Sequence, residues 1–307
     1  MDVVEKYFLS PTDDWEIHYY CAFPQEKIKA IVEISHGMYE NVDAYQSLME
    51  FLCNNGYAVY FLEHRGHGDS ASHGLGNLGE SDIYLKMIRD IRALNVIIRK
   101  QFPYSKIYLL GNSLSAFLVQ RYIQIYPNTI SGMIQCAAGG KDQVPHVKLG
   151  KNIAYSLKKM GFSQKKSPLL FEHQQSFLDS MENSKWLLFS VKNAISKEKL
   201  LSIFSKKDEK AYTVNAYYWI YRGICENFNR KAMKPVNKEL PILLLSGNRD
   251  PIGSFGEGIL HLVRWYQSFG MNSVQYKIYE EIGHNILRSS KREEVYQDIV
   301  DWLETVY

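Results

Sequence analysis

Short apolar runs rich in β-branched and aromatic residues alternate with longer amphipathic segments over most of this 307-residue chain. The runs KAIVEISHG, YAVYFLEHRGHG and KIYLLGNS have the composition of buried strands. Between them, YQSLMEFLCNNG and DIYLKMIRDIRALNVIIRKQFP show helical apolar spacing and stop at Gly56 and Pro103. This alternation predicts an α/β fold with a mostly parallel central sheet and helices on both of its faces.

The alternation is interrupted once and then resumes. A helix LSAFLVQRYIQIYP and a strand ISGMIQCAAGG precede the break, and PILLLSG, GILHLVRWYQSFG, VQYKIYE and REEVYQDIVDWLETVY follow it. The interrupting segment is rich in lysine and aromatic residues and is mostly helical in pattern. We therefore expect residues 1–139 and 236–307 to form one sheet domain, and residues 140–235 to form a helical insertion.

Composition limits the class of protein. Apolar residues make up 46% of the chain and charged residues 22%, which is typical of a globular enzyme. No apolar run approaches the roughly 20 residues of a membrane span, and the first residues lack a signal-peptide pattern. Four scattered cysteines without a C-x-x-C pair read as free thiols. These features predict a cytoplasmic protein.

Chemically useful residues follow four of the expected strands, as SHGMYEN, NSLSA, NRDPIG and GHNIL. In open parallel sheets, sites form beyond the carboxyl ends of the strands. Ser113, Asp250 and His284 occur in the chain order of a nucleophile, an acid and a base. A hydroxyl is a weak nucleophile by itself, so it needs a base within hydrogen-bond reach, and the base needs an acid that orients it.

These motifs resemble those of the serine hydrolases grouped with monoacylglycerol lipases, bacterial lysophospholipases and serine-aminopeptidase-like hydrolases. ISHGMYEN is similar to the family's H-G-x-x-E-H loop, EHRGHGDSA to its D-x-R-G-H-G-x-S turn, and GNSLSA to its G-x-S-x-G-G turn. GNRDPIG and GHNIL are similar to its acid and histidine loops. The resemblance covers nearly the whole chain. It implies an α/β-hydrolase fold with a helical cap over the active site, and no metal or cofactor.

The resemblance also implies a role for each site residue. Ser113 is the expected nucleophile, His284 the base and Asp250 the acid that orients it. The backbone N–H groups of Met38 and Leu114 are expected to form the oxyanion hole. The expected supporting loop residues are His36, Gly37, Glu40 and Arg65, with an ion pair between Glu40 and Arg65.

The sequence departs from the family pattern at a few positions. Ser115 replaces the last glycine of the G-x-S-x-G motif, where we expect tolerated crowding between helix and strand, so that Ser115→Gly keeps activity or raises it modestly. The remaining departures leave Ser113, Asp250 and His284 in place, and they are Asn41 for histidine, Glu63 for aspartate and Asn285 for glutamate.

Two other motifs have bland explanations. GLGNLG matches a dinucleotide-binding fingerprint but does not directly follow a strand, so a loop is the better interpretation. Separately, we expect no nucleic-acid partner. His64, His67 and His73 lack a matching carboxylate cluster and do not indicate a metal site.

The insertion carries about twice as many basic as acidic residues, among apolar and aromatic segments such as WLLFSVKNAI and YTVNAYYWIYRGI. A solvated basic face and a surface that contacts anionic membrane both fit this pattern. Acids are sparse there, with Glu172, Asp179 and Glu182 near the middle of the insertion, which disfavours a pocket for a peptide amine. The sequence therefore predicts a serine ester hydrolase for single-chain acyl esters: monoacylglycerols, lysophospholipids or small carboxylesters. A peptidase on the same fold and a non-catalytic binding protein remain the alternatives.

Overall fold

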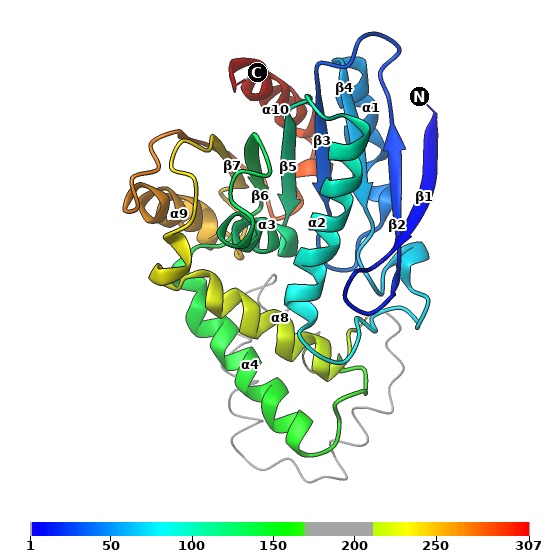
Figure 1. Ribbon diagram of the computed structural model, residues 1–307. Coiled ribbons are helices and arrows are strands. Elements are labelled where there is room, and N and C mark those ends of the chain that lie inside the picture. The colour runs from blue at the N-terminus through cyan, green and yellow to red at the C-terminus, as the bar shows by residue number, and fades with distance from the viewer. Residues whose placement is uncertain (1, 169, 171–210, 307) are drawn as a thin grey trace.

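The computed structural model describes residues 2–168, 170 and 211–306 of the chain. At its centre lies one eight-stranded sheet with the strand order β1-β2-β4-β3-β5-β6-β7-β8 (Figure 1). The strands from β3 to β8 pair in parallel, whereas β2 pairs antiparallel with β1 and with β4. The predicted mostly parallel sheet is thus confirmed. The strands are β1 (Val3–Leu9), β2 (Glu16–Ala22), β3 (Ala30–Ser35), β4 (Tyr57–Leu62), β5 (Ile107–Asn112), β6 (Gly132–Cys136), β7 (Ile242–Gly247) and β8 (Val274–Tyr279).

Helices cover both faces of the sheet, so the central strands β3, β4, β5 and β7 are buried on both sides. On β4, Ala58, Tyr60 and Leu62 face one core, and the alternate residues face the other. Helices α2, α3 and α9 contribute to the first core, and α1 and α10 to the second. The helices are α1 (Gln46–Asn54), α2 (Ile83–Gln101), α3 (Leu114–Ile125), α4 (Val144–Lys159), α8 (Val214–Asn227), α9 (Glu257–Gln267) and α10 (Arg292–Val306).

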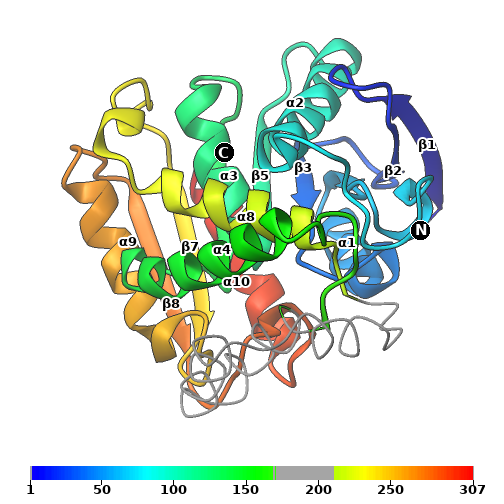
Figure 2. The same cartoon turned by 90° about the horizontal axis from the view of Figure 1, so that it is seen from below.

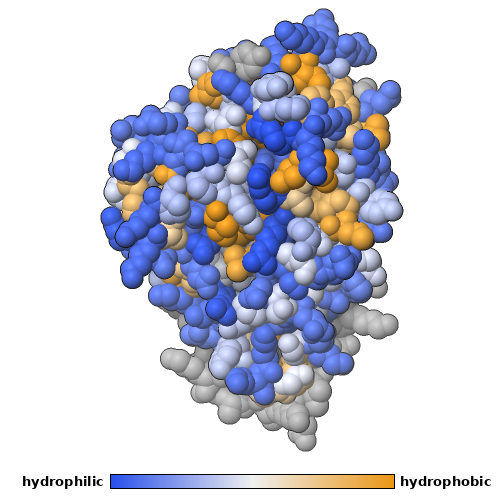
Figure 3. Space-filling view, in the orientation of Figure 1, coloured by the Kyte–Doolittle hydropathy of each residue, from blue (hydrophilic) through white to orange (hydrophobic). Residues whose placement is uncertain are grey.

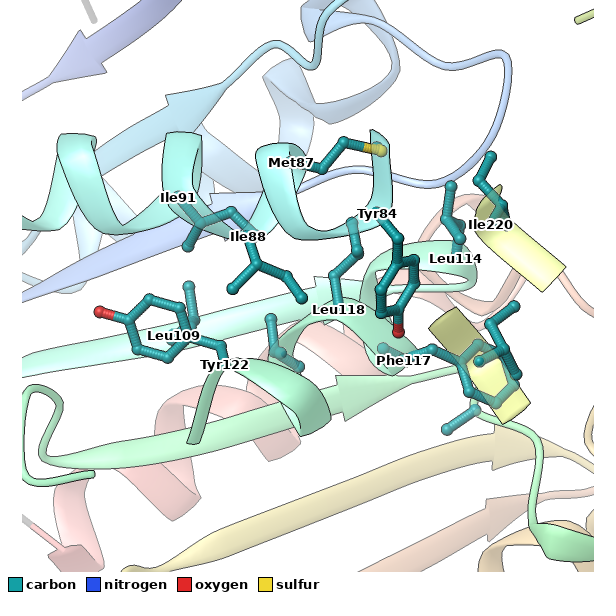
Figure 4. Close-up of a cluster of buried hydrophobic side chains, with 14 of the residues drawn as sticks. Tyr84, Met87, Ile88, Ile91, Leu109, Leu114, Phe117, Leu118, Tyr122 and Ile220 are labelled. Atoms are coloured by element: carbon teal, nitrogen blue, oxygen red, sulfur yellow. The ribbon is translucent and has the colours of Figure 1, made fainter. Parts of the chain in front are cut away.

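The first core continues from the sheet into the cap, as the segment 140–235 is called here. Figure 4 shows Leu109 of β5 and Leu118 of α3 packed with Ile88 of α2. In the same view, Ile220 of α8 lies near Leu114 at the start of α3. The apolar contacts therefore tie the described part of the cap to the helix that follows Ser113.

Helices α4 and α8 are the described helices of the cap. They lie side by side across the carboxyl ends of the strands, as Figures 1 and 2 show from two directions. The segment WLLFSVKNAI and the acids Glu172, Asp179 and Glu182 lie outside the described residues. None of the described helices combines the length and apolar character needed to cross a bilayer.

The strand order reverses its direction at β3. The chain adds β4 on one side of β3 and then returns to add β5 on the other. In open α/β sheets, such a reversal leaves a crevice at the carboxyl ends of the two strands. The loop after β3 carries His36 to Glu40 and the turn after β5 carries Ser113, so both expected parts of the site open into this crevice.

Candidate active site

Ser113 lies on the sharp turn between β5 and α3. Its backbone has φ 54° and ψ −113°, which is unusual for a residue with a side chain. Strand and helix are in close contact here: a Cβ atom on Gly111 would lie 2.3 Å from the carbonyl oxygen of Ser115. Glycine is therefore required at position 111, and the turn holds the Ser113 side chain at the end of the strand, as in the nucleophile turns of α/β hydrolases.

His284 and Asp250 reach Ser113 from two other strand ends. The Ser113 Oγ lies 2.7 Å from His284 Nε2, and His284 Nδ1 lies 3.0 Å from both carboxylate oxygens of Asp250. Asp250 is fully buried, and one of its oxygens also accepts the Ile252 N–H at 2.9 Å. A carboxylate facing Nδ1 favours the tautomer with its proton on Nδ1, which leaves the Nε2 lone pair for the serine hydroxyl. The structure thus brings the three residues of the sequence prediction into one hydrogen-bonded chain.

The loop after β3 passes next to Ser113. A Cβ atom on Gly37 would lie 3.1 Å from the Ser113 Cβ. The Gly37 N–H donates to Glu40 Oε2 at 2.7 Å, and the same oxygen accepts from Tyr45 Oη at 2.6 Å and Asn112 Nδ2 at 3.2 Å. The nearly buried Glu40 carboxylate therefore connects the backbone of this loop to Tyr45 and to Asn112 at the end of β5.

Met38 and Leu114, the two expected oxyanion donors, line the same cavity as Ser113. Most of its other described lining is apolar. It comes from α3, from both cap helices and from the loop after β7, and comprises Phe117, Val147, Ile220, Tyr221, Ile224 and Ile252, with the polar Gln143 and His146. An apolar cavity with a single serine hydroxyl among its described lining residues suits an alkyl or acyl chain.

His36 and Ser115 form a buried polar cluster behind the loop. His36 Nδ1 lies 2.6 Å from the Gly37 carbonyl, so Nδ1 carries the proton, and Nε2 accepts the His64 N–H at 2.9 Å. Burial lowers the pKa of His36 to about 4, which keeps the ring neutral. The Ser115 hydroxyl donates to the His36 carbonyl at 2.5 Å and lies 2.8 Å from Ser35 Oγ and 2.9 Å from His64 Nε2. The hydroxyl of Ser115 is thus a hydrogen-bonded part of the loop support, where crowding alone was expected.

The expected ion pair between Glu40 and Arg65 is wrong. Arg65 is completely buried and pairs with Asp90 at 2.8 Å and Asp13 at 2.9 Å. Glu40 pairs instead with Arg288, 2.7 Å away, in the short turn Ile286–Arg288 that follows His284. The two loops adjoin as expected. The Arg65 side chain, however, points away from the site, toward Asp13 in the loop before β2 and Asp90 on α2.

The two other motifs have structural roles. Gly76 of GLGNLG has φ 72°, and a Cβ there would lie 2.5 Å from the Ala211 carbonyl, so this loop packs closely against the segment that leads into α8. His64 and His67 pack with His36, their ring centroids 4.7 and 4.8 Å from its own. Sequence reasoning missed Tyr39, Tyr45, Asn112 and Arg288 around the loop. Tyr39 and Asn112 stand at variable positions of the ISHGMYEN and GNSLSA motifs, and Tyr45 and Arg288 lie outside the motifs.

Comparisons with known proteins show which families this chain resembles. A family profile described as Hydrolase_4, serine aminopeptidase S33, matches residues 26–291. A monoglyceride lipase homolog of Monkeypox virus is 32% identical over 133 residues, which are 42% of this chain and 47% of that protein. A monoacylglycerol lipase of Mycolicibacterium smegmatis is 28% identical over 115 residues, 36% of this chain and 38% of that protein. The chain thus aligns with less than half the length of these relatives.

Likeness to solved structures extends over the full chain. A thermostable carboxyl esterase from Bacillus coagulans superimposes with a TM-score of 0.82 at 20% identity, covering 100% of this chain and 99% of the esterase. At that identity the likeness shows the fold, which is that of the α/β hydrolases. With the family profile spanning residues 26–291, the chain belongs to the Hydrolase_4 (serine aminopeptidase, S33) family of α/β hydrolases.

Proposed function

We propose that this protein is a serine ester hydrolase that cleaves single-chain acyl esters through an acyl-enzyme intermediate. The observation that carries the proposal is the hydrogen-bonded chain from Ser113 through His284 to Asp250, with distances of 2.7 and 3.0 Å. Its position on a nucleophile turn beside an apolar cavity supports acyl transfer.

The positions of Ser113, His284 and Asp250 support the following course of reaction. Ser113 Oγ attacks the ester carbonyl carbon while His284 Nε2 takes the hydroxyl proton, and the carbonyl electron pair moves to its oxygen. The N–H groups of Met38 and Leu114 stabilise that oxyanion. The oxyanion collapses, the carbon–oxygen bond to the alcohol breaks, and His284 returns the proton to the departing alcohol. Water, activated by the same Nε2, then releases the acid from Ser113.

The cavity lining supports an ester with an alkyl or acyl chain. The described lining residues include no aspartate or glutamate, whereas a pocket for a peptide amine would offer one. Monoacylglycerols, lysophospholipids and small carboxylesters are the proposed substrates. The names of the relatives, monoglyceride and monoacylglycerol lipase, support the first of these.

Two further parts of the proposal concern the location of the protein in the cell and its contact with membranes. The free, scattered cysteines among the described residues are compatible with a cytoplasmic location. The cap presents exposed Lys159 and Lys165 with the half-exposed Tyr155 and Met160. Figure 3 shows mainly hydrophilic side chains over this face, including its lower part, where the cap lies. Such a surface supports peripheral contact with anionic membrane.

Labelling with a fluorophosphonate probe and a panel of p-nitrophenyl esters of increasing chain length test the proposal. Ser113→Ala should remove labelling and lower turnover by on the order of 10⁴-fold or more while the protein stays folded. Ser156→Ala, at an exposed serine on α4, is the matched control and should label like the wild type. Persistent labelling of Ser113→Ala would reject the nucleophile, and a wild type inactive toward every ester would favour a binding protein.

A further inference from the structure

Tyr39, directly after the expected oxyanion donor Met38, has a backbone conformation that bulky residues avoid. Its φ is 63°, in the left-handed region that favours glycine. Such a conformation is unfavourable and persists only where surrounding contacts impose it. The contacts that hold Tyr39 therefore matter for the loop.

Among the described residues, two tyrosines of the cap and His67 of the sheet domain contact Tyr39. The Tyr39 N–H lies 3.3 Å from His67 Nε2 and 3.2 Å from the Tyr212 hydroxyl. Its phenol oxygen lies 2.5 Å from that of Tyr217, on α8. The Tyr39 ring also packs on Tyr212, with a centroid separation of 4.5 Å. Both the backbone and the side chain of Tyr39 are thus held by the cap.

The tautomer of His67 fixes the direction of the hydrogen bond between His67 and Tyr212. Its Nδ1 lies 3.0 Å from the Arg65 carbonyl, which can only accept, so Nδ1 carries the proton. Nε2 is then an acceptor, and the Tyr212 hydroxyl, 2.5 Å away, donates to it. Burial lowers the pKa of His67 to about 3, so the ring stays neutral and this direction of donation holds at neutral pH.

The two cap tyrosines are themselves fixed to the sheet domain. The Thr213 N–H donates to the Gly76 carbonyl at 3.1 Å, and Asn215 Nδ2 donates to the Gly79 carbonyl at 3.1 Å. Tyr212 and Tyr217 are almost completely buried. The start of α8 is therefore hydrogen-bonded to the sheet domain close to the two tyrosines that contact Tyr39.

The peptide that carries the Met38 N–H lies between two anchored peptides. On one side the Gly37 N–H is held by Glu40, and on the other the Tyr39 N–H is held by His67 and Tyr212. We propose that Tyr39 is a positioning residue that transmits the position of the cap helix α8 to the Met38 N–H, and so aligns the oxyanion hole with the cap. This inference rests on the proposed ester hydrolysis and adds to it a role for the cap in the chemical step.

Tyr39→Phe and Tyr212→Phe test the inference, because each removes one hydroxyl and keeps the ring. Tyr155→Phe is the matched control, since Tyr155 is an exposed tyrosine of α4. Hydrolysis of p-nitrophenyl butyrate is compared with that of its thiono analogue, whose C=S sulfur accepts hydrogen bonds poorly and depends less on the oxyanion donors. A fold check by thermal unfolding accompanies each variant.

We expect each variant to lower kcat for the oxo ester about tenfold, less than loss of a whole oxyanion donor costs. KM should change little, and kcat for the thiono ester should fall less than threefold, whereas Tyr155→Phe should leave all values unchanged. Equal losses on both esters would indicate general damage, and an unchanged oxo rate would show that the loop is held without these hydroxyls. Either result overturns the inference while ester hydrolysis stands. A wild type that hydrolyses neither ester, or a Ser113→Ala variant as active as the wild type, rejects the proposed function itself.

Discussion

Glu40 and Arg288 form an ion pair of 2.7 Å that joins the loop beside Ser113 to the turn that follows His284. The Glu40 side chain is 9% exposed and that of Arg288 44%. The other Glu40 oxygen holds the Gly37 N–H. One carboxylate therefore links the expected oxyanion loop with the loop that carries the expected base.

Substitutions at Glu40 should separate these two contacts. Gln can keep one oxygen for Gly37 but loses the charge that pairs with Arg288, whereas Ala loses both. We expect Glu40→Gln to lower kcat a few-fold with little change in KM, and Glu40→Ala to lower it toward the roughly hundredfold loss of an oxyanion donor. Steady-state kinetics with p-nitrophenyl butyrate measures both constants.

Arg288→Gln should match Glu40→Gln, since the same pair is broken. Glu281→Gln is the control, because Glu281 forms an exposed ion pair with Arg249 near the same edge of the sheet. If Glu40→Ala kept the wild-type kcat, the carboxylate would have no role in holding the loop.

Ser115→Ala should lower stability and leave the activity of the folded protein close to that of the wild type. The variant removes a donor to the His36 carbonyl and a neighbour of Ser35 and His64, all of them buried. Leaving buried polar groups without partners costs about 1–3 kcal/mol. Urea unfolding measures the loss, with Ser156→Ala as an exposed serine control. An unchanged midpoint would mean that the cluster rearranges without cost.

Glu33, in the middle of β3, should make stability fall as pH rises. It is fully buried, and burial raises its pKa to about 8, although Asn95 Nδ2 donates to it at 3.0 Å and Arg92 is near. In the unfolded chain the carboxyl ionises near pH 4.5. Between these values the unfolded state binds fewer protons than the folded state, so this residue lowers the free energy of unfolding by up to about 1.4 kcal/mol per pH unit.

The comparison of wild type with Glu33→Gln isolates this contribution, because buried neutral histidines such as His36 act with the opposite sign. Urea unfolding at pH 5, 6.5 and 8 should show the variant gaining stability relative to the wild type as pH rises. Glu50→Gln, at an exposed glutamate of α1, should run parallel to the wild type. Parallel curves for Glu33→Gln as well would mean that Glu33 is charged in the folded protein.

The cap should bind anionic vesicles if its exposed lysines face a membrane. Each lysine near the surface contributes about 1 kcal/mol, and salt screens the attraction. Lys158 is unsuitable for the test, since its ammonium lies 2.5 Å from Asn215 Oδ1 and 4.5 Å from the Tyr218 ring centroid. Lys159→Glu with Lys165→Glu should weaken sedimentation with anionic vesicles at low salt and spare hydrolysis of a small ester.

Lys27→Glu with Lys100→Glu makes the same change of charge at exposed positions away from the cap, and should leave vesicle binding intact. Neutral vesicles should bind less than anionic ones at every salt concentration. Equal binding to both kinds would indicate that the basic face is simply solvated.

Local patterns in the sequence were sufficient for the sheet, its flanking helices and the order of Ser113, Asp250 and His284. Strand and helix periodicities reflect which residues of an element are buried. The turn at Ser113 is a short motif, and the close approach of strand and helix that it requires is permitted by Gly111. For the same reason the boundaries of α2 and of β5 lay close to those expected.

The partners of individual side chains were decided only by the tertiary structure. Glu40 meets Arg288, which is 248 residues away, and Arg65 meets Asp90 and Asp13, although Glu40 and Arg65 occupy adjoining loops. Tyr39 is held by Tyr212 and Tyr217, which lie more than 170 residues further along the chain. Periodicity indicates which face of an element is buried, but a hydrogen bond depends on directions and on tenths of an ångström between loops from different strands. Those distances are set by how the cap and the strand ends pack together, which no local stretch of sequence encodes.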